Sequence, residues 1–187
     1  MEPLHADRVL ELVLRASPDL NLADALALSG ILGAARDQSL EAGVPLGSAL
    51  GLEGPALEAF LRRRFPGWSE TMEESPVPGE LDEARCRTRQ LLRRFRTGAS
   101  DLELELAEII ARRMDSPGHL WKILGLRDRA ELWDLMVRHF APLVARNAEG
   151  MRWKKFISRM ICLDGTGTCP SPTCGDCAER EECFGPE

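Results

Sequence analysis

The chain has 187 residues, and its 44% hydrophobic content suffices for one globular domain of ordinary size. A formal net charge of −6 at pH 7 argues against a protein whose whole surface binds nucleic acid. We expect a cytoplasmic protein, because the sequence shows neither the apolar core of a signal peptide nor an apolar run of about 18 residues that could span a membrane. Abundant leucine, alanine, arginine and glutamate and the absence of tyrosine favour helix over sheet.

Residues 1–65 are predicted to form an N-terminal helical region. Its expected elements are a helix over 4–15, a second from the Ser17–Pro18 start signal to about Arg36, a loop over 43–54, and a helix from Pro55 to about Phe65. Residues 66–80 are rich in proline, glycine, serine and acids. This composition predicts an exposed linker or a long loop within one helical domain.

Residues 81–161 are predicted to form a helical core. Its expected elements are helices over 81–97 and 101–114, the latter capped by Ser100, a short turn after Ser116–Pro117, a helix over 128–147 that Pro142 kinks or splits, and a final helix over about 150–161. Glycines and prolines exclude regular structure from residues 162–187. The predicted fold is therefore an all-α, multi-helix domain with an irregular, cysteine-rich, metal-binding C-terminal tail.

The tail carries four closely spaced cysteines at positions 169, 174, 177 and 183. The segment has almost no apolar residues, so hydrophobic burial cannot order it. A metal can supply the missing free energy, because the free energy of ligand binding becomes free energy of folding. Thiolates are soft ligands that suit iron–sulfur clusters and zinc. The pattern therefore predicts that Cys169, Cys174, Cys177 and Cys183 hold a metal centre.

The spacing favours a cluster over zinc. Zinc modules usually separate two ligand pairs by a longer finger, whereas here the fourth cysteine follows after five residues and the tail has no histidine. The C-x4-C-x2-C run matches the spacing of three cluster cysteines in plant-type ferredoxins. Zinc, disulfides and free thiols remain open on spacing alone.

Four further residues have a metal-binding and a structural interpretation. Cys162 is either a fifth ligand or a small apolar residue that closes the last helix, and His119 is a candidate nitrogen ligand in a turn. Cys86 is expected to be an ordinary thiol, and His139, on an apolar helix stripe, is expected to pack in the core.

The final helix is amphipathic. Its apolar side chains, Trp153, Phe156, Ile157, Met160 and Ile161, share one face, and the basic side chains Arg152, Lys155 and Arg159 share the other. The basic face is interpreted either as a solvated surface or as a surface that attracts an anion such as molybdate, an anionic cluster or an acidic partner.

The cysteine pattern resembles that of the NifQ nitrogen-fixation proteins. The resemblance includes the Met151–Phe156 segment, Cys162, the four tail cysteines, and upstream the segments 109–113, 119–121, 124–126 and 136–143. It is close over residues 104–187 and loose in the N-terminal half. One departure is that the region 112–114 lacks a cysteine that many members carry.

The resemblance implies a carrier rather than an enzyme. Members of this family bind an iron–sulfur cluster containing molybdenum and supply the metal for the nitrogenase iron–molybdenum cofactor. The expected partners are a molybdate or other molybdenum source, the cofactor assembly scaffold and the nitrogenase iron protein. The family's motif cysteines correspond to Cys169, Cys174, Cys177 and Cys183.

Three rival functions follow from the residues themselves. The first is a structural zinc module that presents a helical interaction domain, and the second is an enzyme that acts on molybdate. No nucleotide-binding loop or nucleophile–base motif supports an enzyme. Nucleic-acid binding is not expected, because the chain lacks global positive charge and a set of base-stacking aromatic residues.

Overall fold

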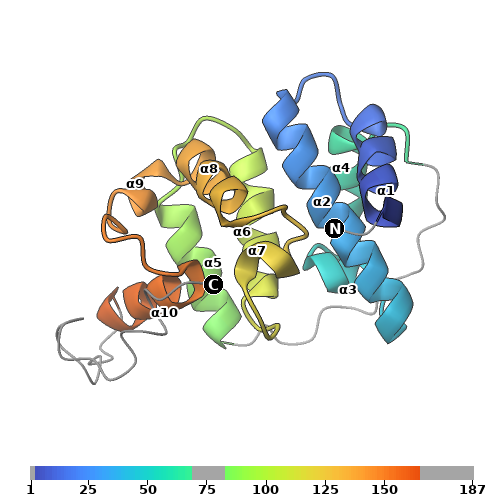
Figure 1. Cartoon of the computed structure of the whole chain (residues 1–187). Coiled ribbons are helices and arrows are strands. Elements are labelled where there is room, and N and C mark those ends of the chain that lie inside the picture. The colour runs from blue at the N-terminus through green and yellow to red at the C-terminus, as the bar shows by residue number, and fades with distance from the viewer. Residues whose placement is uncertain (1–2, 69–82, 165–187) are drawn as a thin grey trace.

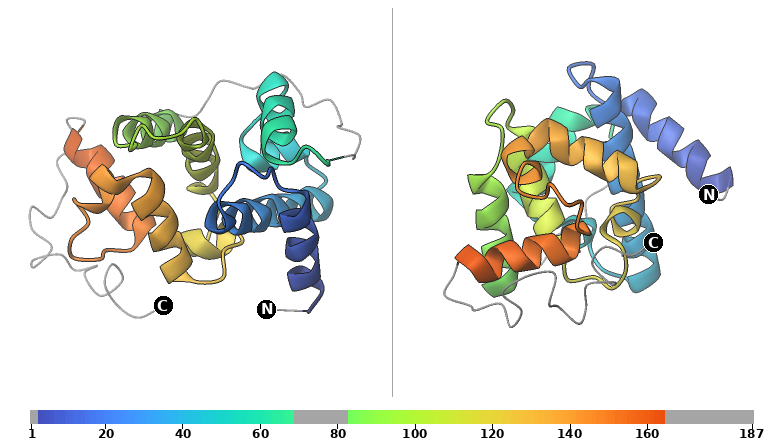
Figure 2. Two further views of the ribbon diagram at one scale, coloured as in Figure 1. Left: turned by 90° about the horizontal axis from the view of Figure 1, so that it is seen from above. Right: turned by 60° about the vertical axis from the view of Figure 1, so that its left-hand side comes forward.

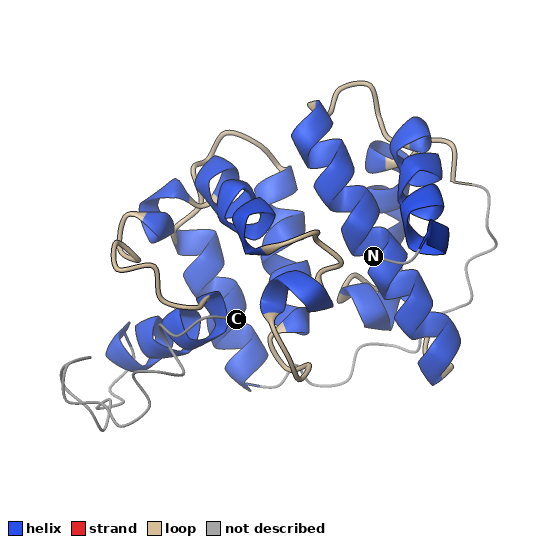
Figure 3. Ribbon diagram, in the orientation of Figure 1, coloured by secondary structure: helices blue, strands red, loops and turns tan. Residues whose placement is uncertain are grey.

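The computed structural model describes residues 3–68 and 83–164 and shows only helices in these ranges (Figure 3). The helices are α1 (Pro3–Arg15), α2 (Leu22–Ala42), α3 (Leu46–Leu50), α4 (Pro55–Arg64), α5 (Glu83–Arg94), α6 (Leu102–Arg113), α7 (Leu120–Ile123), α8 (Arg129–His139), α9 (Ala141–Val144) and α10 (Trp153–Asp164). The all-α prediction is confirmed for this part of the chain. The tail that was predicted to be irregular lies outside it, apart from the residues that continue α10.

The helices form two neighbouring groups, with α1–α4 on one side and α5–α10 on the other (Figures 1 and 2). One hydrophobic core runs through both groups, from Leu12 on α1 to Ile157 on α10. The predicted division into an N-terminal region, a linker and a helical core stays a prediction, because residues 69–82 are not described. In the described ranges, each helix is too short or too polar to cross a membrane.

Polar contacts also join the two groups. The buried carboxylate of Glu105 on α6 accepts a hydrogen bond from Nε of Arg64 on α4 at 2.8 Å. Nε of Arg112 on α6 donates to the carbonyl oxygen of Ser48 on α3, also at 2.8 Å. Because these contacts bridge about forty to sixty residues of sequence, they add to the hydrophobic core in setting the position of α6 against α3 and α4.

Two predictions in the N-terminal region were wrong. No helix begins at Ser17–Pro18, and this segment is a turn. The backbone N–H of Ser17 donates to the carbonyl oxygen of Arg64 at 2.8 Å. The helix instead begins after Asn21, whose side-chain oxygen caps the backbone N–H of Asp24 at 2.9 Å, and it continues to Ala42, past the predicted end. The predicted loop over 43–54 contains α3, which buries Ala49 and Leu50.

The proline predictions were confirmed. Pro55 opens α4. Pro142 lies where the predicted 128–147 helix divides, with α8 ending at His139 and α9 beginning at Ala141.

Two glycines allow α2 to approach the turn after α7. A Cβ atom added at Gly30 would lie 2.5 Å from the carbonyl oxygen of Gly125. Gly125 itself has a φ of +71°, which side chains with a Cβ rarely adopt. The N-terminal helices and the segment that carries α7 are therefore in direct backbone contact.

Candidate metal centre

The four predicted cluster cysteines, Cys169, Cys174, Cys177 and Cys183, lie in residues 165–187, outside the described residues. The structure instead shows the helix that precedes them and the other candidate ligands. Within residues 3–68 and 83–164, no group of three or more His, Cys, Asp or Glu side chains is arranged to hold a metal ion. The metal centre predicted at the four cysteines stays a prediction.

Helix α10 packs firmly on the core before the tail begins. Trp153, Phe156 and Ile157 are buried, as the amphipathic pattern predicted. The Trp153 ring lies 5.5 Å from the ring of Trp133 and 5.8 Å from that of Phe156, measured between centroids. Aromatic packing of this kind adds to the hydrophobic burial of the helix. The helix that directly precedes the tail is thus packed on the core.

The start of α10 is positioned by a buried asparagine. Nδ2 of Asn147 donates to the carbonyl oxygen of Met151, and Oδ1 of Asn147 accepts from the backbone N–H of Met151, both at 2.9 Å. The two hydrogen bonds close a loop between α9 and α10. Because the side chain satisfies a backbone donor and acceptor that are buried, it sets the direction in which α10 leaves the core.

Cys162 lies in the last turn of α10, which extends to Asp164 rather than ending near residue 161 as predicted. Its side chain is exposed. It lines a surface cavity of about 480 Å³ between α5 and α10, together with Glu83 and Ser158. Cys162 therefore does not close the helix by burial in the core. Its proposed role as a ligand stays a prediction.

His119 lies at the other end of α10 from Cys162. It precedes α7 and lines a cavity of about 210 Å³ with Trp153 and Lys154 from the first turn of α10. Lys154 and Cys162 are eight residues apart, so about 12 Å of helix separates this cavity from the thiol. The described residues do not bring His119 and Cys162 together.

Basic side chains line the same cavity. Two of them, Arg152 and Lys155, belong to the predicted basic face of the last helix, while Arg129 on α8 and Lys154 on α10 were not predicted. No local sequence signal placed Arg129 at this cavity, because Arg129 lies in a separate segment of the chain. Lys154 directly follows the buried Trp153, and helical spacing alone did not place it with the basic face.

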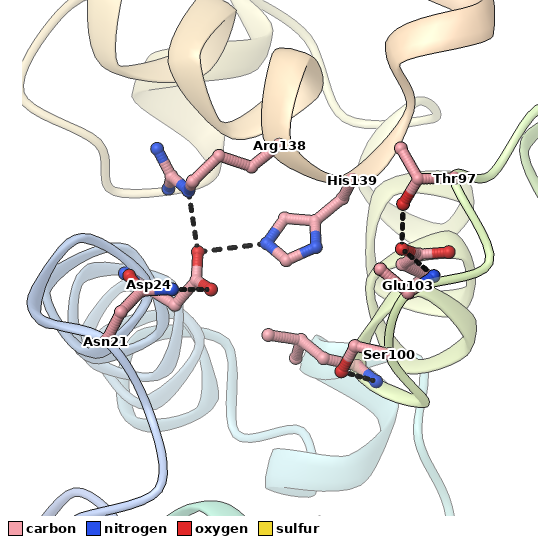
Figure 4. A network of polar contacts seen from close by, with 9 residues as sticks. Asn21, Asp24, Thr97, Ser100, Glu103, Arg138 and His139 are labelled. Carbon is pink, nitrogen blue, oxygen red and sulfur yellow. Dashed lines mark hydrogen bonds and ion pairs between the residues drawn. The ribbon is translucent and has the colours of Figure 1, made fainter.

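His139 is buried, as predicted, but it also holds a polar contact that the sequence did not reveal (Figure 4). Its Nε2 lies 2.9 Å from Oδ1 of Asp24 on α2, and Nε of Arg138 donates to the same oxygen at 2.9 Å. Burial alone would raise the pKa of Asp24, but the hydrogen bonds and charges of His139 and Arg138 lower it from 3.8 to about 2. This contact joins α2 to the end of α8.

A second buried carboxylate lies on the other side of His139 (Figure 4). Glu103 accepts hydrogen bonds from the Thr97 hydroxyl and from the backbone N–H groups of Gly98 and Ala99. Burial raises the pKa of Glu103, and these hydrogen bonds outweigh that effect and lower it. Because the N–H of Thr97 donates to the carbonyl oxygen of His139 at 3.0 Å, Glu103 orders the loop that holds the end of α8.

Comparisons with known proteins identify relatives of the chain. The sequence model of the NifQ family matches residues 27–185. The chain is 41% identical to protein NifQ of Rhodobacter capsulatus over 146 residues, which cover 76% of this chain and 79% of that protein. It is 41% identical to the protein NifQ homolog of Sinorhizobium fredii over 145 residues, which cover 73% of this chain but 61% of that protein. Protein NifQ of Klebsiella pneumoniae is 40% identical over 132 residues. No solved structure matches.

Proposed function

The chain belongs to the NifQ family, and on this premise we propose that it carries molybdenum within an iron–sulfur cluster for assembly of the nitrogenase iron–molybdenum cofactor. One observation carries the proposal. The Cys169-x4-Cys174-x2-Cys177-x5-Cys183 pattern falls entirely within residues 27–185, the range that the family model matches. The part of the chain that resembles the family therefore includes the four cysteines, and this supports the proposal.

The donor set suits such a cargo. Four thiolates provide soft ligands for iron. Molybdenum has to be released, so we propose that the cysteines hold the iron corners and that molybdenum makes fewer bonds to the protein. We propose Cys162 as an additional ligand, because it is exposed at the end of the packed helix α10 and precedes Cys169 by seven residues.

The proposed role is that of a carrier that acts with other proteins. A molybdate or other molybdenum source would load it, and the cofactor assembly scaffold and the nitrogenase iron protein would be its partners. The proposal places it in the cytoplasm, where a reducing environment keeps cysteines available as thiolates. The fixed position of α10 would present the tail to these partners while the helical core stays folded.

The test is anaerobic reconstitution with iron, sulfide and molybdate, followed by metal analysis. We expect the unaltered chain to become brown and to retain iron, sulfide and molybdenum through gel filtration. The variant Cys174→Ala/Cys177→Ala should lose most of all three, because two of four ligands are removed. Cys86→Ala is the matched control, since Cys86 lies half-buried on α5, and it should retain them.

Two outcomes would contradict the proposal. Unchanged iron and molybdenum content in the double cysteine variant would show that Cys174 and Cys177 are not ligands of the cluster. A colourless protein that binds one zinc ion, but no iron, would favour the rival interpretation as a structural zinc module.

A further inference from the structure

The end of α5 carries more positive charge than the carboxylates around it neutralise. Arg89 and Arg93 share the carboxylate of Glu108 on α6, with nitrogen–oxygen distances of 3.6 and 2.6 Å. Just past the end of the helix, Arg96 is exposed, and no ion pair links it to a carboxylate in the described part of the chain. This end of α5 is therefore locally positive, although the whole chain has a formal net charge of −6.

A further arginine reaches the same place from a distant segment. Arg146, which follows α9, has its guanidinium carbon 4.4 Å from the centroid of the Phe95 ring. The guanidinium carbon of Arg94 lies 5.4 Å from the same centroid. Because both guanidinium groups lie over one ring, they are held near each other at the surface. We call Arg94, Arg96 and Arg146 the Phe95 arginine patch.

The positive charge of Arg146 is not neutralised by its contacts. Its Nη1 donates to the carbonyl oxygen of Pro142 at 3.1 Å, and its other contact is the Phe95 ring. Among residues 3–68 and 83–164, Arg146 forms no ion pair with a carboxylate, and its side chain is exposed. A guanidinium that is already held by a ring and a carbonyl loses less side-chain entropy when it binds a ligand. Arg146 is therefore prepared to bind an anionic group.

We infer that the Phe95 arginine patch is a docking surface for a carboxylate-rich segment of a partner protein. The guanidinium fork matches the geometry of a carboxylate and donates charge-assisted hydrogen bonds to it. Arginine and aromatic residues are also enriched at protein interfaces. A nucleic acid fits less well, because the net negative charge of the chain repels a long polyanion beyond the patch. The inference does not depend on the proposed metal centre.

The test is fluorescence anisotropy of the full chain with a labelled glutamate-rich peptide. The same peptide with glutamine in place of glutamate and a short DNA duplex are the comparison probes. The altered proteins are Arg96→Gln/Arg146→Gln and Arg96→Gln alone, the second of which changes only an exposed side chain. The matched control, Arg62→Gln/Lys122→Gln, removes two exposed charges from α4 and α7, outside the patch. Circular dichroism confirms that each variant is folded.

We expect saturable binding of the glutamate peptide that weakens about tenfold or more in the double variant and about threefold in Arg96→Gln. The charge-matched control should change it less than about twofold, and added salt should weaken it. Binding should persist in Cys174→Ala/Cys177→Ala, so a failure of the metal-centre proposal is distinguishable from a failure of this one.

Three results would overturn the docking surface. They are the absence of saturable binding, equal weakening in the charge-matched control, and equally tight binding of the glutamine peptide. DNA that binds as tightly as the glutamate peptide would overturn a protein as the partner.

Discussion

The buried contact between α2 and α8 yields a stability prediction that can be worked out from the structure. Changing Asp24 to Asn keeps the size of the side chain but removes the negative charge that faces Arg138 and His139. The pKa of Asp24 falls from 3.8 to about 2 in the folded protein. At 1.36 kcal/mol per pKa unit, the ionised carboxylate stabilises the fold by about 2 kcal/mol near neutral pH.

The pH dependence has a definite sign. Because the pKa of Asp24 is lower in the folded than in the unfolded chain, its contribution is present above about pH 4 and is lost as the pH falls toward 2. At pH 3 roughly half of it should remain. Other carboxylates titrate in both proteins, so the difference between unaltered chain and variant isolates Asp24.

Urea unfolding at pH 7 and pH 3 measures this difference. We expect Asp24→Asn to lower the free energy of unfolding by about 2 kcal/mol at pH 7 and by about half as much at pH 3. Glu11→Gln, which breaks an exposed ion pair with Arg15, is the control and should cost under about 0.5 kcal/mol. An equal loss of unfolding free energy at both pH values would show that the charge of Asp24 does not stabilise the fold.

Two further substitutions test the contacts that place α7 and α10. In thermal unfolding, Gly30→Ala should lower the free energy of unfolding by about 1–3 kcal/mol, because its Cβ would collide with the backbone of Gly125. The control is Ser29→Ala, which removes a buried hydroxyl that has no hydrogen-bond partner in the described structure. It should be neutral or stabilising in the same measurement. Asn147→Ala should cost about 2–3 kcal/mol in urea unfolding, since it leaves the buried N–H and carbonyl of Met151 without their partner; a cost below about 0.5 kcal/mol would contradict the positioning role.

Local signals in the sequence predicted much of the fold. Pro55 and Pro142 marked a helix start and a helix division correctly, because proline acts through its own ring and its missing N–H. The start of α2 was missed because a distant residue decides it. The N–H of Ser17 bonds to the carbonyl of Arg64, and Asn21 becomes the cap instead. Capping signals alone did not choose between Ser17 and Asn21.

The candidate site divides in the same way. The cysteine pattern is local, so spacing alone suggested a metal centre. The basic cavity is not local, because Arg129 reaches it from α8 and Lys154 from α10. Asp24 and His139 are 115 residues apart, and nothing in either segment indicated the other. Contacts of this kind depend on how helices pack and carry no sequence period.

The proposed cluster places sulfur and iron around molybdenum. X-ray absorption at the molybdenum edge, on protein isolated without oxygen from cells supplied with molybdate, tests it most directly. We expect sulfur atoms as the nearest neighbours of molybdenum and iron atoms beyond them, and we expect both to be lost in Cys174→Ala/Cys177→Ala. A spectrum with oxygen neighbours alone, or protein without molybdenum and iron even after reconstitution, would contradict it.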